Sequence, residues 1–161
     1  MSESNKSESK LYEMCVRGHE YREDYEFEML GESVTASLAP LKDEKFLPIA
    51  AFLKEHLDMD EEEAVEAIED AKDEADEAGE DTIDITRMDK AFVAAIQRAA
   101  VGGLKGSYSE DGDLIDHTED EAEKMVGMMV GGYSVELGGK ALELSGDVRD
   151  VEKFPGSRGG Q

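Results

Sequence analysis

Several residue types that globular proteins use freely are scarce in this chain of 161 residues. It has no tryptophan, aromatic residues make up 6% of it, and Cys15 is its single cysteine. One cysteine cannot form an intramolecular disulfide, which excludes a disulfide-stapled secreted fold. No apolar run approaches the ~20 residues that span a bilayer, and the opening MSESNKSESK has neither a signal-peptide nor a lipidation pattern. The sequence therefore predicts a soluble, intracellular protein with no membrane segment.

Basic residues are also scarce: 17 lysines and arginines stand against 41 aspartates and glutamates, for a formal net charge of −24. In dilute buffer such a charge pushes the compact state apart, whereas at about 1 M salt the Debye length is roughly 3 Å and the repulsion is screened. Because the acidic residues spread over most of the chain, we expect adaptation to a salt-rich cytoplasm, as in extreme halophiles. The lack of a basic stripe argues against direct nucleic-acid binding.

The stretch around which the chain is organised is DEEEAVEAIEDAKDEADEAG, residues 60–79. Asp60 is expected to cap a helix there and Gly79 to stop it. Apolar residues recur at alternating spacings of four and three, which places them on one helical face: Ala64, Ile68, Ala71, Ala75 and Ala78. The helix is therefore predicted to dock by its alanines and to show carboxylates to solvent.

The residues before this helix carry the strongest strand signal. Apolar and polar residues alternate on both sides of Gly31, which predicts an antiparallel hairpin with one buried face over residues 25–38. Residues 11–16 are a candidate third strand, with a turn at Gly18 and His19. The sheet is expected to end before the helices begin.

Two further helices are predicted in this part of the chain. One follows Asp43, and its regular part is expected to begin near Leu47 because Pro48 lacks a backbone N–H. It is expected to form a helical hairpin with the acidic helix. The other helix, RMDKAFVAAIQRAA, is capped by Asp84 or Thr86 and stopped by the glycine pair that follows it. Because it is the most apolar and least acidic helix, we expect it to be central.

The remaining third of the chain has shorter elements. Residues 105–117 are predicted to form a loop or a small hairpin that turns at Asp111-Gly112. Thr118 and Glu121 form a capping box ahead of a short helix. Alternating apolar residues over 133–144, interrupted by a glycine pair, predict a second hairpin. A flexible tail follows, anchored by one apolar side chain.

Together these elements predict an α+β fold: a small N-terminal antiparallel sheet packed with about three helices, then a short helix and a β-hairpin. The chain is divided into a disordered tail (1–10), a main α+β domain (11–103), a smaller C-terminal helix-hairpin module (104–146) and a flexible tail (147–161). The glycines at the end of the third helix mark the boundary between the two modules.

No catalytic, cofactor or metal site is predicted. Cys15 and His19 have a spacing that suits half of a zinc site, but the chain has no second cysteine. The acidic loop SEDGDLIDH fails the spacing of oxygen donors that an EF-hand needs, and the glycines at 102–106 lack the Walker spacing. No Ser–His–Asp or Cys–His arrangement stands out. We therefore expect a protein that is not an enzyme.

One cluster is a candidate surface for binding a partner: Met125, Met128 and Met129. Methionine adapts its shape and is over-used where one surface must fit several partners. The alternative is that these methionines fill a core that is short of aromatic residues. Phe154, the apolar anchor of the C-terminal tail, is the other candidate contact.

Two stretches resemble a known family. The opening YEFEMLGESVTASLAPLKDEKFLPIAAFLKEHL resembles the start of small tail-assembly chaperone-like proteins of tailed viruses. The acidic background and the ending MVGGYSVELGGKALELSGDVRDVEKFPGSRGG resemble uncharacterised proteins of haloarchaeal tailed viruses and proviruses.

This resemblance implies a non-enzymatic structural or assembly protein that works with the tail tube or tape-measure protein during virion morphogenesis. It would act in the cytoplasm of a halophilic archaeal host or as a minor virion component, as a single chain or a homo-oligomer. Two other functions stay open. One is a cellular acidic regulator or DNA mimic, and the other is an enzyme whose site has no recognisable motif.

Overall fold

The acidic stretch forms helix α4 (Glu61–Glu77) in the computed structural model, which describes residues 9–148. The predicted cap is confirmed. The Glu63 N–H donates to Asp60 Oδ1 at 2.9 Å, and the Asp60 N–H donates to Glu63 Oε1 at 3.0 Å. Gly79 follows the helix with a φ of 76°, the left-handed conformation expected of the glycine after a helix.

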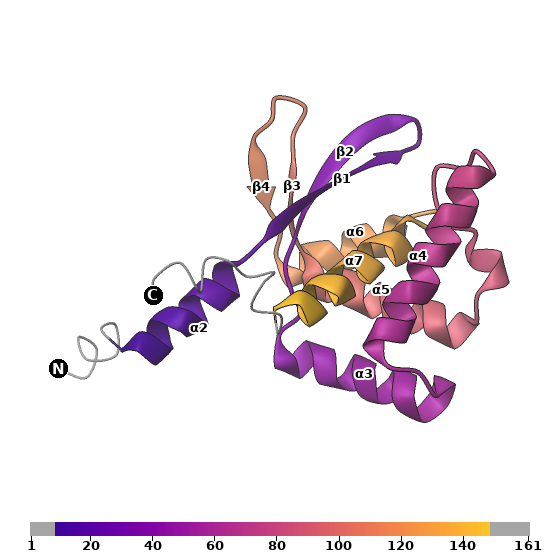
Figure 1. Ribbon diagram of the computed structural model, residues 1–161. Coiled ribbons are helices and arrows are strands. Elements are labelled where there is room, and N and C mark those ends of the chain that lie inside the picture. The colour runs from indigo at the N-terminus through magenta and orange to yellow at the C-terminus, as the bar shows by residue number, and fades with distance from the viewer. Residues whose placement is uncertain (1–8, 149–161) are drawn as a thin grey trace.

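The fold is α+β, as predicted, and its four strands form one antiparallel sheet in the order β1-β2-β3-β4 (Figure 1). The strands are β1 (Glu23–Met29), β2 (Glu32–Leu38), β3 (Leu104–Tyr108) and β4 (Leu114–Asp116). The N-terminal hairpin is confirmed, with Tyr25 opposite Ala36. The β3–β4 hairpin turns through Gly112 at a φ of 87°. Since β2 pairs with β3, the predicted boundary after residue 103 runs through the sheet.

Helix α5 (Lys90–Gly103) is central, as its composition predicted. It packs against α3 (Asp43–Leu57), α6 (Glu119–Met128) and α7 (Tyr133–Asp147), which surround it in Figure 1. One core cluster lies among α3, α4, α5 and α7, and a second lies among the sheet, α5, α6 and α7. Both clusters draw on α5 and α7, so these two helices hold the fold together.

The prediction of a second β-hairpin over residues 133–144 is wrong, because these residues belong to helix α7. The alternating pattern misled because α7 is buried on almost every side. Val135, Leu137 and Leu142 are each at most 1% exposed, and a helix buried all round has no polar face to give it a period of 3.6 residues.

The glycine pair inside α7 marks close helix packing instead of a turn. A Cβ added to Gly138 would lie 2.1 Å from the carbonyl oxygen of Ile96 in α5. A Cβ added to Gly139 would lie 2.8 Å from Cγ2 of Ile68 in α4. The two glycines therefore let α7 approach α5 and α4 closely.

The candidate third strand over residues 11–16 is also wrong, since these residues lie in helix α2 (Lys10–Glu20). Ser9 caps this helix, and its Oγ accepts the Tyr12 N–H at 3.2 Å. The apolar residues fit the helical period better than the period of two that a strand requires. Ser9 and Lys10 thus belong to a capped helix instead of a disordered tail, and residues 1–8 lie outside the described part.

Three smaller corrections concern helix ends. Helix α3 begins at Asp43, not near Leu47, so Pro48 lies inside it and one hydrogen bond of the helix is missing. The N-cap of α5 is Asp89, whose Oδ1 accepts the Ala91 N–H at 2.8 Å. Asp84 instead caps the short 3₁₀ turn η1 (Ile85–Arg87).

Helices α3 and α4 do not form the predicted packed hairpin. The chain turns sharply at Asp58, which has a φ of 51°, and α3 then packs mainly on α5 while α4 packs on α7. Helix α7 reaches Asp147, the first residue of the predicted tail. Within residues 9–148, no helix has the length and apolar character needed to cross a membrane.

Candidate interaction surfaces

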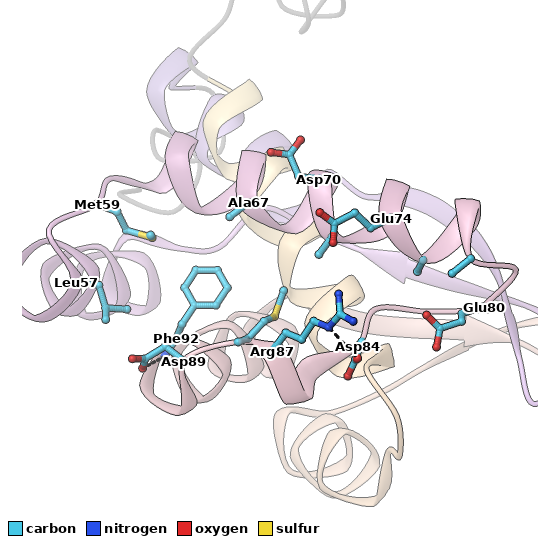
Figure 2. A pocket seen from close by; sticks show the side chains of 14 residues that line it. Leu57, Met59, Ala67, Asp70, Glu74, Glu80, Asp84, Arg87, Asp89 and Phe92 are labelled. Carbon is cyan, nitrogen blue, oxygen red and sulfur yellow. Dashed lines mark hydrogen bonds and ion pairs between the residues drawn. The ribbon is translucent and has the colours of Figure 1, made fainter.

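A groove of about 570 Å³ opens between α4 and the segment that runs from η1 into α5 (Figure 2). Leu57, Met59 and Phe92 lie toward one end of it, and Glu80 and Asp84 toward the other. The apolar lining comes from small side chains of α4 and larger ones opposite, namely Leu57, Met59, Ala67, Ala71, Ala75, Ala78, Met88 and Phe92.

The predicted alanine stripe of α4 therefore has two roles. Its first half, Ala64 and Ile68, is buried in the core beneath α7. Its second half lines the groove, where Ala71 is half-buried, Ala75 is buried at 3% exposed and Ala78 is exposed. Because alanine side chains are short, they leave room along α4 for the side chains of another molecule.

Carboxylates surround the apolar lining, from Asp70, Glu74, Glu80, Asp84 and Asp89. The one cation among the lining residues is Arg87, whose Nε lies 3.7 Å from Asp84 Oδ2. Hydrogen bonds from the Thr86 side chain and backbone hold the pKa of Asp84 below its usual range. The rim is therefore strongly negative and favours a cationic partner.

The methionines predicted as a binding surface do not share one exposed face. Met125 and Met129 pack against the core cluster of the sheet, α6 and α7. Met128 is 67% exposed. Filling of the core thus accounts for two of the three side chains. The fourth predicted contact, Phe154, lies outside the described residues.

Glu136 of α7 is a buried carboxylate, 6% exposed, that no sequence pattern predicted. Tyr25 Oη donates to its Oε2 at 2.5 Å, and Thr82 Oγ1 donates to its Oε1 at 3.0 Å. Lys72 Nζ lies 3.6 Å from Oε1. These contacts tie β1, α4 and the connection after α4 to α7. A fully paired buried carboxylate of this kind fixes structure, and the only sequence signal for it is one Glu within an apolar run.

The stability of the protein at alkaline pH is expected to depend on this cluster. Burial, together with the hydrogen bond and charge of Glu136, raises the pKa of Tyr25. Tyr21 lies outside the Glu136 cluster, but burial and a hydrogen bond to Glu23 likewise raise the pKa of Tyr21 to about 12. A tyrosine whose folded pKa exceeds its unfolded value of ~10 contributes stability that is complete below pH ~10 and is lost as the pH rises through the folded pKa.

We therefore expect the urea midpoint to fall above pH ~10, and to fall less steeply in Tyr25→Phe than in the wild type. Tyr12→Phe is the control, because Tyr12 lies exposed on α2. Urea unfolding followed by circular dichroism across the alkaline range measures these slopes. Equal slopes for the two variants would contradict the assignment.

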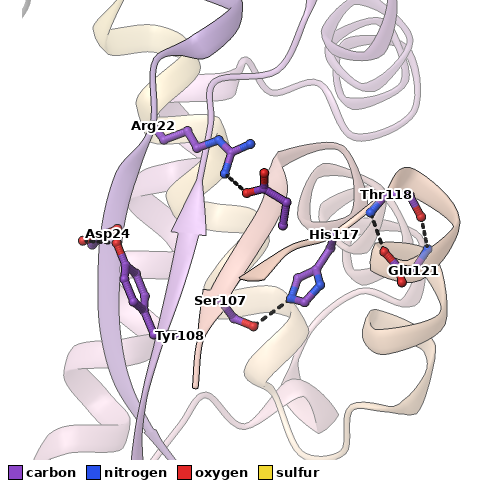
Figure 3. Close-up of polar contacts among 8 residues, drawn as sticks. Arg22, Asp24, Ser107, Tyr108, His117, Thr118 and Glu121 are labelled. Atoms are coloured by element: carbon purple, nitrogen blue, oxygen red, sulfur yellow. Dashed lines mark hydrogen bonds and ion pairs between the residues drawn. The ribbon is translucent and has the colours of Figure 1, made fainter. Parts of the chain in front are cut away.

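Ser107 and His117 are the pair that most resembles a catalytic arrangement, with Ser107 Oγ 2.7 Å from His117 Nε2 (Figure 3). A serine nucleophile also needs a histidine oriented by a third group. Among residues 9–148 no carboxylate hydrogen-bonds to His117. Two neighbouring contacts link the β3–β4 hairpin to β1 and to the residue before it. Arg22 Nη1 donates to Asp116 Oδ1 at 2.8 Å, and Tyr108 Oη donates to Asp24 Oδ1 at 3.1 Å. The Ser107–His117 contact joins β3 to the residue that follows β4.

The two residues weighed as zinc ligands, Cys15 and His19, lie one turn apart on α2, and both are exposed. The part of the chain that the structure describes contains no group of three or more His, Cys, Asp or Glu side chains placed to hold a metal ion.

Comparisons of the chain with protein-family models, with curated proteins and with solved structures give no match. The geometry of these surfaces is therefore the guide to function.

Proposed function

We propose that this protein is a non-enzymatic assembly protein that binds a partner through the groove between α4 and α5. The observation that carries the proposal is the groove itself. Its floor is apolar and includes the small side chains of α4, and carboxylates lie around this apolar lining. An amphipathic helix fits this shape and charge if its apolar face is flanked by lysine or arginine. This is the helix-in-groove mode of recognition.

The salt-rich setting explains why an apolar groove is needed. At a net charge of −24, the chain is suited to a cytoplasm where concentrated salt screens exposed charges. Attraction between surface charges is weak there, whereas burial of apolar surface retains its full effect. The apolar lining would then supply affinity, and the carboxylates would set the orientation of the partner.

The partner class follows from the family resemblance of the sequence. We propose a structural protein of a haloarchaeal tailed virus, of the tail tube or tape-measure type, bound in the cytoplasm of the host. The alternative is a cellular acidic regulator that mimics DNA with the carboxylates of α4. A DNA mimic binds through charge, so its complexes should dissociate as salt rises, whereas a complex held in the groove should persist.

A tagged pull-down from infected haloarchaeal lysate in concentrated KCl, with partners identified by mass spectrometry, tests this function. The wild type is expected to recover tail or other virion proteins. Ala71→Trp fills the groove and should lower their recovery roughly tenfold or more, equivalent to about 1.4 kcal/mol of binding free energy. Ala78→Trp, at the exposed end of the groove, should act in the same direction.

The control is Glu77→Trp, on the same helix but outside the groove lining. It should bind as the wild type does, and circular dichroism should show all three variants folded. Equal recovery by Ala71→Trp and Glu77→Trp would exclude the groove as the binding site. Recovery of host DNA-binding proteins alone, in a parallel pull-down at lower KCl but not in concentrated KCl, would favour the acidic regulator.

A further inference from the structure

Within residues 9–148, helix α2 lacks the packing that usually keeps a short helix folded. It projects away from the other helices (Figure 1). None of its 11 residues is buried within the structure of residues 9–148, and Leu11, Tyr12 and Val16 are 75%, 42% and 36% exposed. Isolated helices shorter than ~12–15 residues are marginal in water. A stable α2 therefore calls for a partner that covers it.

The apolar side chains of α2 form one broad face. At the helical period, Cys15 stands at the centre of this face, and the other apolar side chains lie on both sides of it. The opposite side of the helix carries two cations and two carboxylates, Lys10, Glu13, Arg17 and Glu20. Apart from His19, α2 is thus electrically balanced, in a chain whose net charge is −24.

A groove of about 700 Å³ opens beside one edge of this face. Helix α2 contributes Met14, Cys15 and Gly18 to one wall, and the facing wall consists of Pro40, Leu41 and Val148. The charged groups that line it are Arg17, Lys42 and Asp43, with His19 beside them. The groove is therefore largely apolar and, unlike the groove beside α4, has no excess of negative charge.

We propose that α2 of a second copy of this chain occupies this groove, so that two α2 helices pair antiparallel about a two-fold axis near Cys15. This interface is separate from the groove proposed to bind the assembly partner, and it does not depend on that function. Two-fold symmetry brings the middle of a self-pairing helix opposite its own counterpart, and Cys15 is the middle residue of Lys10–Glu20.

The distribution of charge favours a second copy of the chain as the partner, and the groove beside α2 as the place where it binds. Over the rest of the surface, two copies of net charge −24 repel each other. At α2 and its groove, positive and negative groups balance or positive groups prevail, so two copies can approach without a like-charge penalty. A stable interface buries about 800 Å² on each partner. Because that exceeds what one short helix offers, the wall of Pro40, Leu41 and Val148 must take part.

Sedimentation velocity of the full chain in concentrated KCl, over a range of protein concentrations, tests the proposal. The wild type is expected to reach a dimer and no larger species. Leu11→Asp should raise the dimer dissociation constant at least tenfold, equivalent to about 1.4 kcal/mol. The control is Leu30→Asp, because Leu30 in the β1–β2 turn is 74% exposed, almost the same as Leu11. It should leave the dimer unchanged.

Cys15 provides a second readout because it is the only cysteine of the chain. Diamide, a thiol oxidant, should remove two electrons and two protons from a facing pair of Cys15 thiols and give a disulfide-linked dimer. Leu11→Asp should lower the yield of this dimer, and Leu30→Asp should not. A monomer at all concentrations, an oligomer larger than a dimer, or a dimer that neither responds to Leu11→Asp nor forms the disulfide would overturn the proposal.

Discussion

Replacing Gly138 with alanine is expected to lower the free energy of unfolding by about 3 kcal/mol or more. The added methyl group would lie 2.1 Å from the carbonyl oxygen of Ile96 and 2.6 Å from its Cγ2. That carbonyl is part of the backbone of α5 and cannot rotate away as a side chain can. Helix α7 must therefore move off α5, which loosens the packing between the two helices that hold both core clusters.

Gly127→Ala is the matched control for this substitution. Gly127 lies in helix α6, and apart from its chain neighbours and the backbone of its own helix, nothing lies within 4 Å of an added Cβ there. Alanine is a better helix former than glycine, so this change should raise stability by about 0.5–1 kcal/mol. Urea unfolding in concentrated KCl, followed by circular dichroism, measures both. A neutral Gly138→Ala would mean that residues 133–144 do not pack as helix α7 does here.

The elements that the sequence predicted correctly have signals confined to a few neighbouring residues. Asp60 with Glu63, and Thr118 with Glu121, form capping boxes in which each side chain bonds to backbone three residues away. The N-terminal hairpin likewise needs only alternation on both sides of one turn. Such signals can be recognised in the sequence without knowledge of the rest of the fold.

Helix α7 could not be identified in this way because its character depends on distant residues. Tyr133, Val135 and Leu137 alternate as a strand would, and a glycine pair follows them as a turn would. Only the positions of Ile96 and Ile68 show that the glycines permit close contact between helices. Helix α2 is a different case, because Ser9 and the spacing of the apolar residues after it were sufficient to predict it.

The groove beside α4 was only half predictable. The sequence shows the alanine stripe and its carboxylates, but not how far along the stripe α7 extends. That limit is set by the packing of Gly139 against Ile68, and it leaves Ala71 and Ala78 at the groove. The facing residues, Met88 and Phe92, come from a separate segment whose position follows from the core.

Stability is expected to rise steeply as KCl increases from dilute to concentrated. On a helix, like charges four residues apart destabilise by ~0.2–0.5 kcal/mol per pair at low ionic strength. Helix α4 alone has five such pairs, which together cost about 1–2.5 kcal/mol: Glu62–Glu66, Glu66–Asp70, Glu69–Asp73, Asp70–Glu74 and Asp73–Glu77. The remaining excess of carboxylates adds repulsion of the same kind. In dilute buffer we therefore expect a protein close to unfolding.

A variant of α4 separates charge screening from the general effect of salt on apolar burial. It neutralises five exposed residues that neither cap the helix nor line the groove beside α5: Glu62→Gln, Glu66→Gln, Glu69→Gln, Asp73→Asn and Glu77→Gln. If repulsion is the cause, urea midpoints should show this variant about 1–2 kcal/mol more stable than the wild type in dilute KCl.

In concentrated KCl, where the Debye length is ~3 Å, the wild type and the variant should be almost equal. Sucrose is the control solute, because it strengthens burial without screening charge and should stabilise both proteins alike. Parallel salt curves for the two proteins would show instead that salt acts through apolar burial. The carboxylates of α4 would then serve a role other than salt adaptation, and the acidic regulator would become the stronger candidate.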